Sequence, residues 1–117
     1  MSEGIQQIVY PVTDLAKAKT LYSELLGVEP YADAPFYVGF RVGDQELGLD
    51  PRGHGKGMTG PVGYWNVHDI RSALKALLDA GVEVQQEVTD VGRGLLIAAV
   101  KDADGNVTGL FQAPAGG

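Results

Sequence analysis

The side chains that carry chemistry in this sequence are few, and their types exclude several classes of enzyme. The chain has 117 residues, with two histidines and no cysteine. The absence of cysteine excludes disulfides, thiolate metal sites and a cysteine nucleophile. No serine stands in a Gly-x-Ser-x-Gly turn, so nothing favours a hydrolase. A metal site would have to be built from Gln7, Glu46, Asp50 or a histidine.

Each of these side chains also has a simpler structural role. Glu46 is expected to pair with Arg41 across a hairpin, because opposite charges stabilise facing strand positions. Asp50 directly precedes a proline and is expected to begin a turn. His54 lies in a glycine-rich stretch that we expect to be solvated, and His68 directly precedes a helix N-cap.

A second set of residues suits the binding of a small organic molecule. The alternation of side chains along the expected strands places Tyr37, Tyr64 and Phe111 on faces that also carry polar groups. Aromatic rings with an arginine and amides fit a planar or amphipathic ligand. The ligand-binding residues that we predict are Gln7, Tyr37, Arg41, Tyr64, Asn66 and Phe111. The prediction includes no metal ligand and no catalytic residue.

Two helices are expected to position these residues. Apolar side chains recur at helical spacing over residues 15–26 and again over residues 70–80. Asp14 and Asp69 stand where an N-cap is expected, and Gly27 and Gly81 stand where each helix should stop. The two caps and the two stops are separated by nearly the same interval, which indicates an internal repeat.

Strand patterns follow each helix in the same order. The expected strands are 28–32, 36–42 and 45–50 in the first half, and 83–89, 95–101 and 107–112 in the second. The sequence therefore predicts a single domain over 1–117, with repeat modules 4–50 and 61–113 joined by a linker over 51–60. Each module reads βαβββ, which predicts an α+β fold.

A short turn determines which strand residues share a face. Gly43 and the aspartate after it form a two-residue hairpin turn, which places Arg41 opposite Glu46 and Phe40 opposite Leu47. The apolar face is then expected to pack on the helix. The opposite face is polar, aromatic and rich in glycine.

Composition narrows the class of partner. The net charge is −6 and the pI is about 4.7, so the surface lacks the clustered cations that nucleic acids or anionic membranes require. No long apolar segment and no signal-peptide pattern is visible. These features predict a cytoplasmic protein with no nucleic-acid partner and no membrane partner.

Three segments carry a resemblance to a known family. They are QIVYPVTDLAKAKTLYSELLG from Gln7, YWNVHDIRSALKALLDAG from Tyr64 and KDADGNVTGLFQ from Lys101. Together they resemble the vicinal oxygen chelate superfamily, which includes lactoylglutathione lyase, bleomycin-resistance proteins and extradiol dioxygenases. The resemblance implies two βαβββ modules that form a curled mixed sheet with a central cup.

The resemblance also implies a metal site, from which this sequence departs. In the family's enzymes, His, Gln and Glu side chains hold a divalent ion that the substrate chelates. Gln7 fills the ligand position of the first strand, but its counterpart in the second half is Val62. The acidic ligand of the final strands is replaced by Gly48 in the first half and by Gly109 in the second.

The sequence therefore favours a protein that binds a small organic ligand in the cup, with no metal and no other cofactor. Two alternatives remain open. The first is a metal-dependent lyase, isomerase or dioxygenase with a displaced metal site. The second is a non-catalytic dimeric interaction module, since family members commonly pair. We expect the chain to form a homodimer whichever of these functions it has.

Overall fold

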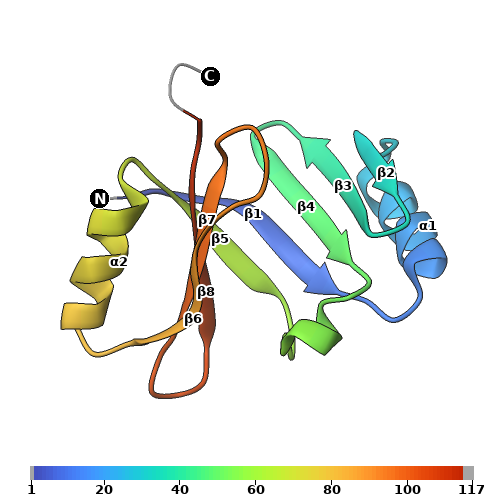
Figure 1. The fold of residues 1–117 in the computed structure, drawn as a ribbon. Helices are drawn as coiled ribbons and strands as arrows, with labels where there is room; N and C mark the ends of the chain where they lie inside the picture. Colours follow the sequence, from blue (N-terminus) through green and yellow to red (C-terminus); the bar gives the residue numbers. More distant parts are fainter. Residues whose placement is uncertain (1, 115–117) are drawn as a thin grey trace. The chain divides into compact units, whose positions relative to one another are not determined.

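The computed structural model describes residues 2–114, apart from the side chain of Glu3. Within these residues the order βαβββ occurs twice, which confirms the α+β fold (Figure 1). The first set is β1 (Ser2–Pro11), α1 (Leu15–Leu26), β2 (Ala32–Ala34), β3 (Tyr37–Val42) and β4 (Gln45–Asp50). The second set is β5 (Val62–Val67), α2 (Ile70–Asp79), β6 (Glu83–Asp90), β7 (Leu96–Lys101) and β8 (Val107–Gln112). A short 3-10 helix, η1 (His54–Lys56), lies between them.

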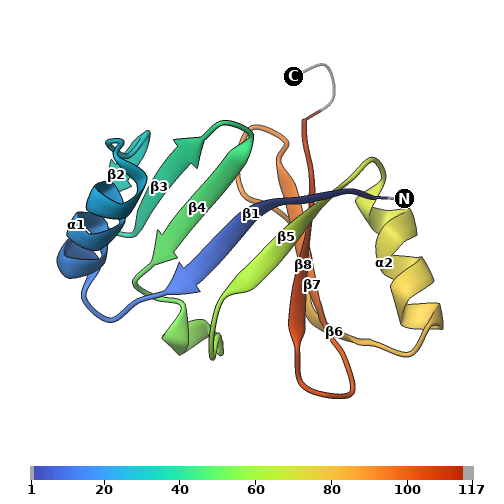
Figure 2. The same cartoon turned by 180° about the vertical axis from the view of Figure 1, so that it is seen from behind.

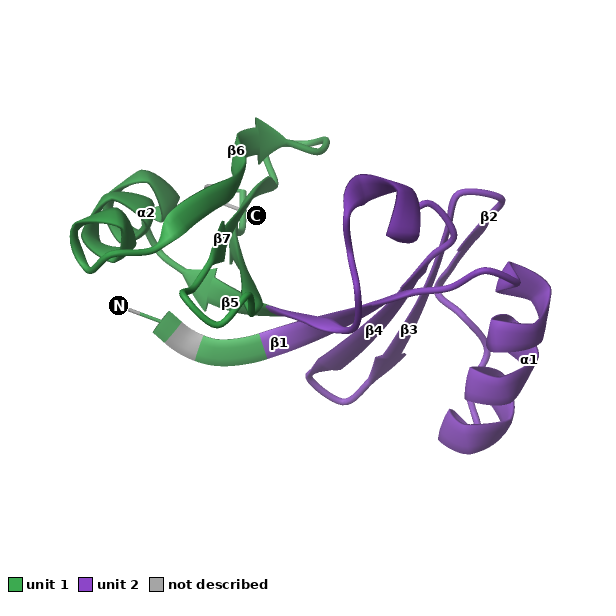
Figure 3. Ribbon diagram, turned by 90° about the horizontal axis from the view of Figure 1, so that it is seen from below, with its two compact units in different colours: residues 1–5, 64–117 green, residues 6–63 purple. Residues whose placement is uncertain are grey.

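The strands form a mixed eight-stranded sheet in the order β2-β3-β4-β1-β5-β8-β7-β6. Strand β1 pairs in parallel with β4, and β5 pairs in parallel with β8. The pairs β2–β3, β3–β4, β6–β7 and β7–β8 are antiparallel. The chain divides into two compact units (Figure 3). Unit 1 contains residues 1–5 and 64–117, and unit 2 contains residues 6–63. Strand β1 therefore contributes to both units.

Both helices begin where the sequence predicts. The Asp14 carboxylate accepts a hydrogen bond from the backbone N–H of Lys17 at 3.0 Å, and Asp69 does the same for Ser72 at 3.2 Å. These bonds satisfy amides that have no partner inside the helix. Gly27 ends α1 in the left-handed conformation, with φ of 70°. Helix α2 ends at Asp79, one residue earlier than expected.

One predicted strand is misplaced. The pattern predicts a strand over 28–32, but β2 covers Ala32–Ala34 instead. Pro30 explains the shift, because proline has no N–H to donate to a neighbouring strand. The pairing with β3 begins only after it, where the N–H of Tyr31 donates to the carbonyl of Gly39 at 2.9 Å. The other strand ends differ from the prediction by at most one residue.

Unit 2 has the core that the hairpin register predicts. Strands β3 and β4 pair with Arg41 opposite Glu46 and Phe40 opposite Leu47, as expected. Val38, Phe40 and Leu49 are buried at the centre, and side chains from β1 and α1 pack against them. Figures 1 and 2 show α1 lying along β2, β3 and β4. The opposite face of these strands is left for polar and aromatic residues.

Unit 1 has a separate core. Ile70 and Ala73 of α2 are buried against Val67, Ala98 and Leu110 of the strands. This packing places the other face of β5 and β8 away from α2. In the described part of the chain, neither helix has the length and apolar character needed to cross a membrane.

Candidate functional site

The strands of unit 2 bring polar and aromatic side chains together opposite the helix. We call this surface the tyrosine face and define it by Gln7, Tyr31, Tyr37, Arg41 and Glu46. Gln7 of β1 lies beside Glu46 of β4 in the parallel register. Arg41 of β3 lies on the other side of Glu46. A central carboxylate is thus flanked by an amide and a guanidinium.

Glu46 holds two partners on this face. The Tyr31 hydroxyl donates to its Oε1 at 2.6 Å, and Nη2 of Arg41 lies 3.5 Å from the same oxygen. The Arg41 guanidinium also lies 4.3 Å from the centre of the Tyr31 ring, which favours a cation–π contact. The ion pair predicted from the sequence is confirmed, and it is extended by a tyrosine that sequence analysis missed.

Tyr31 stays protonated in this setting. Partial burial raises the pKa of its phenol well above the ordinary range, and the hydrogen bond to the Glu46 carboxylate raises it further. Arg41 acts in the opposite direction but is the weaker influence. The hydroxyl is therefore a fixed hydrogen-bond donor at physiological pH.

Tyr37 lies across the position of the family's acidic ligand in unit 2. A Cβ atom at Gly48 would lie 2.8 Å from Cζ of Tyr37, which is closer than carbon atoms normally approach. Nε2 of Gln7 donates to the Tyr37 hydroxyl at 2.6 Å and holds the ring over the glycine. Tyr31 covers Gly39 in the same way, with its Cζ 2.9 Å from the place of a Cβ. Glycine is required at both places because the rings lie directly on the sheet.

The three predicted ligand-binding residues of unit 1 also gather on neighbouring strands. Tyr64 of β5 pairs with Gly109 of β8, and Asn66 pairs with Phe111. A Cβ at Gly109 would lie 2.7 Å from Cγ of Tyr64, so the ring covers this glycine. In each unit, therefore, a tyrosine occupies the space above the glycine that replaces an acidic metal ligand.

The residues present do not fit a metal at the family's site. Val62, at the second-half position equivalent to Gln7, is buried and has no donor atom. Gly48 and Gly109 have no side chain, so Gln7 would be the single protein ligand at that site. Among residues 2–114, no cluster of three or more His, Asp or Glu side chains could hold an ion.

The carboxylates considered for a displaced metal site have other partners. Glu46 binds the groups described above. Asp50 is 7% exposed, and its oxygens accept from the N–H of Arg52 and from Nζ of Lys56, both at 2.9 Å. These contacts confirm the expected turn at Asp50. His54 and His68 are both exposed.

A sequence comparison identifies the family. The model of the Glyoxalase/Bleomycin resistance protein/Dioxygenase superfamily matches residues 4–110, so the chain belongs to this superfamily. The resemblance seen in the sequence is thus confirmed. A comparison with curated proteins finds no match.

Solved structures share the fold. A superfamily member from Vibrio splendidus 12B01 has a TM-score of 0.71 and 15% identity, covering 91% of this chain and 96% of its own. Methylmalonyl-CoA epimerase from Mycobacterium tuberculosis has a TM-score of 0.71 and 19% identity, covering 97% and 89%. The Mn(II)-bound glyoxalase from Novosphingobium aromaticivorans has a TM-score of 0.72 and 18% identity, covering 95% of this chain and 39% of its own. At these identities the likeness extends to the fold alone.

Proposed function

We propose that this chain binds a small organic ligand without a metal ion. The residues that we propose for ligand binding are Gln7, Tyr37 and Arg41 in unit 2, and Tyr64, Asn66 and Phe111 in unit 1. No residue of the chain acts on it as a catalyst. The observation that carries this proposal is the pair of covered glycines, Gly48 beneath Tyr37 and Gly109 beneath Tyr64.

The covered glycines favour binding over metal catalysis for a steric reason. A carboxylate at either position would need the tyrosine ring to leave. The tyrosines in turn provide what an organic ligand needs, because each presents an aromatic ring and a hydroxyl. Arg41 adds a cation that is already stacked on Tyr31.

The chemistry of the tyrosine face favours a planar ligand with polar edges. Rings that lie against a sheet offer apolar contact surfaces, and Gln7 and Arg41 supply donors beside them. Glu46 is neutralised by Arg41, so the face does not strongly prefer one sign of charge. A metal-dependent lyase, isomerase or dioxygenase remains the alternative function. Measurements of ligand binding with and without a divalent metal distinguish it from metal-free binding.

The test is a ligand screen followed by NMR on isotope-labelled protein in the presence of EDTA. The probes are planar aromatic compounds with amide, carboxylate or phenol groups. We expect at least one to cause saturable shifts at the amides of Tyr37, Arg41 and Tyr64. Binding that appears only after a divalent metal is added would favour the enzyme, and no saturable shift at these residues would refute the proposal.

A matched pair of variants locates the site. Tyr37→Ala removes a ring from the tyrosine face, while Phe36→Ala removes the neighbouring ring, which is 58% exposed. We expect only Tyr37→Ala to weaken binding, because Phe36 does not belong to the proposed site. Equal effects of the two substitutions would contradict the assignment.

The expected homodimer is also part of the proposal. Leu25 of α1 is 70% exposed and is the most exposed large apolar side chain described. Its burial against a second copy would remove apolar surface from water.

A further inference from the structure

The two helices, although equivalent in the repeat, pack differently in their own units. Ile70, Ala73 and Leu74 of α2 are buried in unit 1. None of the twelve residues of α1 is buried in unit 2. Leu21 of α1 remains 59% exposed. Helix α1 therefore packs less closely on its own sheet than α2 does.

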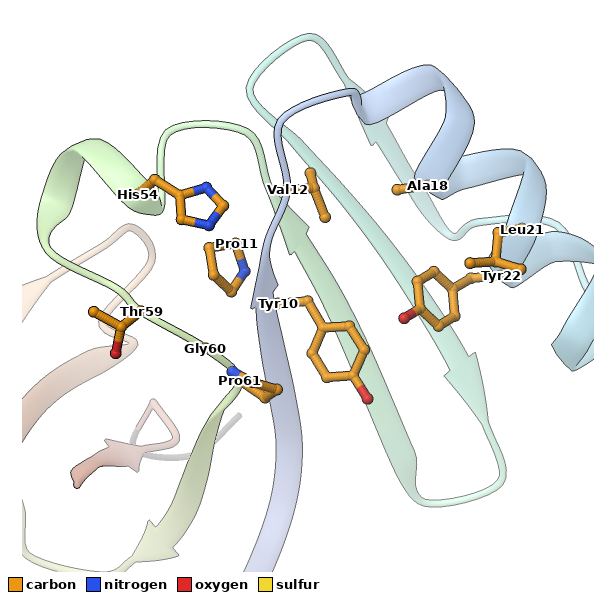
Figure 4. A pocket seen from close by; sticks show the side chains of 10 residues that line it. All are labelled: Tyr10, Pro11, Val12, Ala18, Leu21, Tyr22, His54, Thr59, Gly60 and Pro61. Carbon is orange, nitrogen blue, oxygen red and sulfur yellow. The ribbon is translucent and has the colours of Figure 1, made fainter.

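Beside α1 lies a cavity of about 330 Å³ within unit 2 (Figure 4). Its walls come from the end of β1, from α1, from η1 and from the segment that follows η1. Tyr10 and Val12 of β1 also pack against the core beneath α1. The cavity thus lies on the helix side of β1, whereas Gln7 belongs to the opposite side. The volume is at the lower end of the range for small-molecule sites.

The segment that completes the cavity is held in place by specific contacts. Gly53 is buried so close to Pro11 that an added Cβ would lie 2.7 Å from its ring. The Asp50 carboxylate anchors the same segment through Lys56 and the N–H of Arg52. The N–H of Met58 donates to the carbonyl of Gly53 at 3.0 Å. These contacts fix the position of η1, which carries His54 to the cavity.

The lining combines apolar walls with neutral polar groups. The rings of Tyr10 and Tyr22 meet edge to face, with centres 5.5 Å apart and planes at 72°. Burial raises the pKa of the Tyr22 phenol, and the neighbouring Tyr10, which is its hydrogen-bond partner, raises it further. Thr59 and the His54 ring add polar groups, and the lining contains no carboxylate. Such a lining favours an aromatic ring with a hydrogen-bond acceptor.

We propose that this cavity is a second binding site, for a small aromatic molecule that carries a carbonyl or similar hydrogen-bond acceptor. The ring packs against Tyr10 and Tyr22, and the acceptor takes the place of Tyr10 as hydrogen-bond partner of the Tyr22 hydroxyl. The site is independent of the tyrosine face, because it shares no residue with it.

The test uses acetophenone, with ethylbenzene as a probe of the same shape that lacks the acceptor. Both are titrated into isotope-labelled full chain and followed by the amide signals. We expect saturable shifts at Tyr22, His54 and Thr59, with acetophenone about two- to tenfold tighter, the equivalent of one hydrogen bond. Shifts that do not saturate, or that fall on Tyr37 and Arg41 instead, would overturn the proposal. Equal affinity of the two probes would overturn the assigned ligand class.

Two variants keep the test independent of folding defects. Tyr22→Phe keeps the ring and removes only the hydroxyl, so acetophenone should bind no better than ethylbenzene. Thr59→Trp fills the cavity from an exposed loop and should abolish the shifts of both probes. Phe36→Ala removes an exposed ring that belongs to neither site and should change neither titration. If both Tyr22→Phe and Thr59→Trp bind acetophenone as tightly as the wild type does, the proposed site is refuted.

Discussion

The substitution Gly48→Ala tests whether Tyr37 lies on the sheet as described. The new methyl carbon would lie 2.8 Å from Cζ of Tyr37, against an optimal carbon separation of about 3.5–4.0 Å. The ring must therefore tilt away, and its hydroxyl loses the 2.6 Å hydrogen bond from Gln7. Overpacking costs about 1–3 kcal/mol and the hydrogen bond about 0.5–1.5 kcal/mol.

The same substitution also has a smaller stabilising effect. Gly48 does not have a positive φ, so alanine fits its backbone and is favoured over glycine in a strand by roughly 0.5–1 kcal/mol. The net expectation is a loss of about 1–3 kcal/mol in the free energy of unfolding, since the costs exceed this gain. The assay is urea denaturation followed by circular dichroism.

The double variant Gly48→Ala/Tyr37→Ala identifies the cause of the loss. Without the ring, the alanine should be neutral or slightly stabilising relative to Tyr37→Ala alone, giving a coupling energy of about 1 kcal/mol or more. Gly55→Ala is the control, because a Cβ there meets nothing within 4 Å. If Gly48→Ala destabilises equally with and without Tyr37, the reasoning about the covered glycine is wrong.

Three further outcomes are expected. Because the pKa of Tyr31 is raised, its stabilising contribution is present below the ordinary tyrosine pKa of about 10 and is lost as the pH rises toward the higher pKa of the folded state. In an absorbance titration, Tyr31→Phe should remove a phenol that ionises above the ordinary tyrosine pKa, and Glu46→Gln should lower the pKa of Tyr31. If Tyr31→Phe instead removes a phenol with an ordinary pKa, the hydrogen bond to Glu46 is contradicted. In urea denaturation, Asp50→Asn should lower the free energy of unfolding by about 1–3 kcal/mol, because the carboxylate is buried and hydrogen-bonded. The control Asp79→Asn, at an exposed residue, should lower it by no more than about 0.5 kcal/mol. Equal losses would contradict the anchoring role of Asp50. Sedimentation should show a dimer that Leu25→Glu weakens, and a monomeric wild type would refute the homodimer.

The features that the sequence predicts best depend on local interactions. Asp14 and Asp69 cap their helices through bonds to backbone amides three residues away. The turn at Gly43 determines the facing pairs of β3 and β4 because the register of a hairpin follows from its turn. The ion pair of Arg41 with Glu46 follows from that register.

The features that sequence analysis missed depend on contacts between distant side chains. Tyr31 lies in the segment where a strand was misplaced, so its bond to Glu46 could not be anticipated. Alternation places Tyr37 on the correct face but does not give the rotamer that carries its ring over Gly48. The glycines at 39, 48 and 109 were a usable signal, because a strand glycine often marks a close approach.

Metal content tests the central claim of metal-independent binding most directly. Untagged protein, purified without chelator, is loaded with nickel, zinc, manganese or iron, desalted and analysed by mass spectrometry. The account predicts that far less than one equivalent remains bound, because Gly48, Gly109 and Val62 offer no donor side chain. One tightly bound equivalent that disappears in Gln7→Ala or Glu46→Ala would contradict it and would establish a displaced metal site.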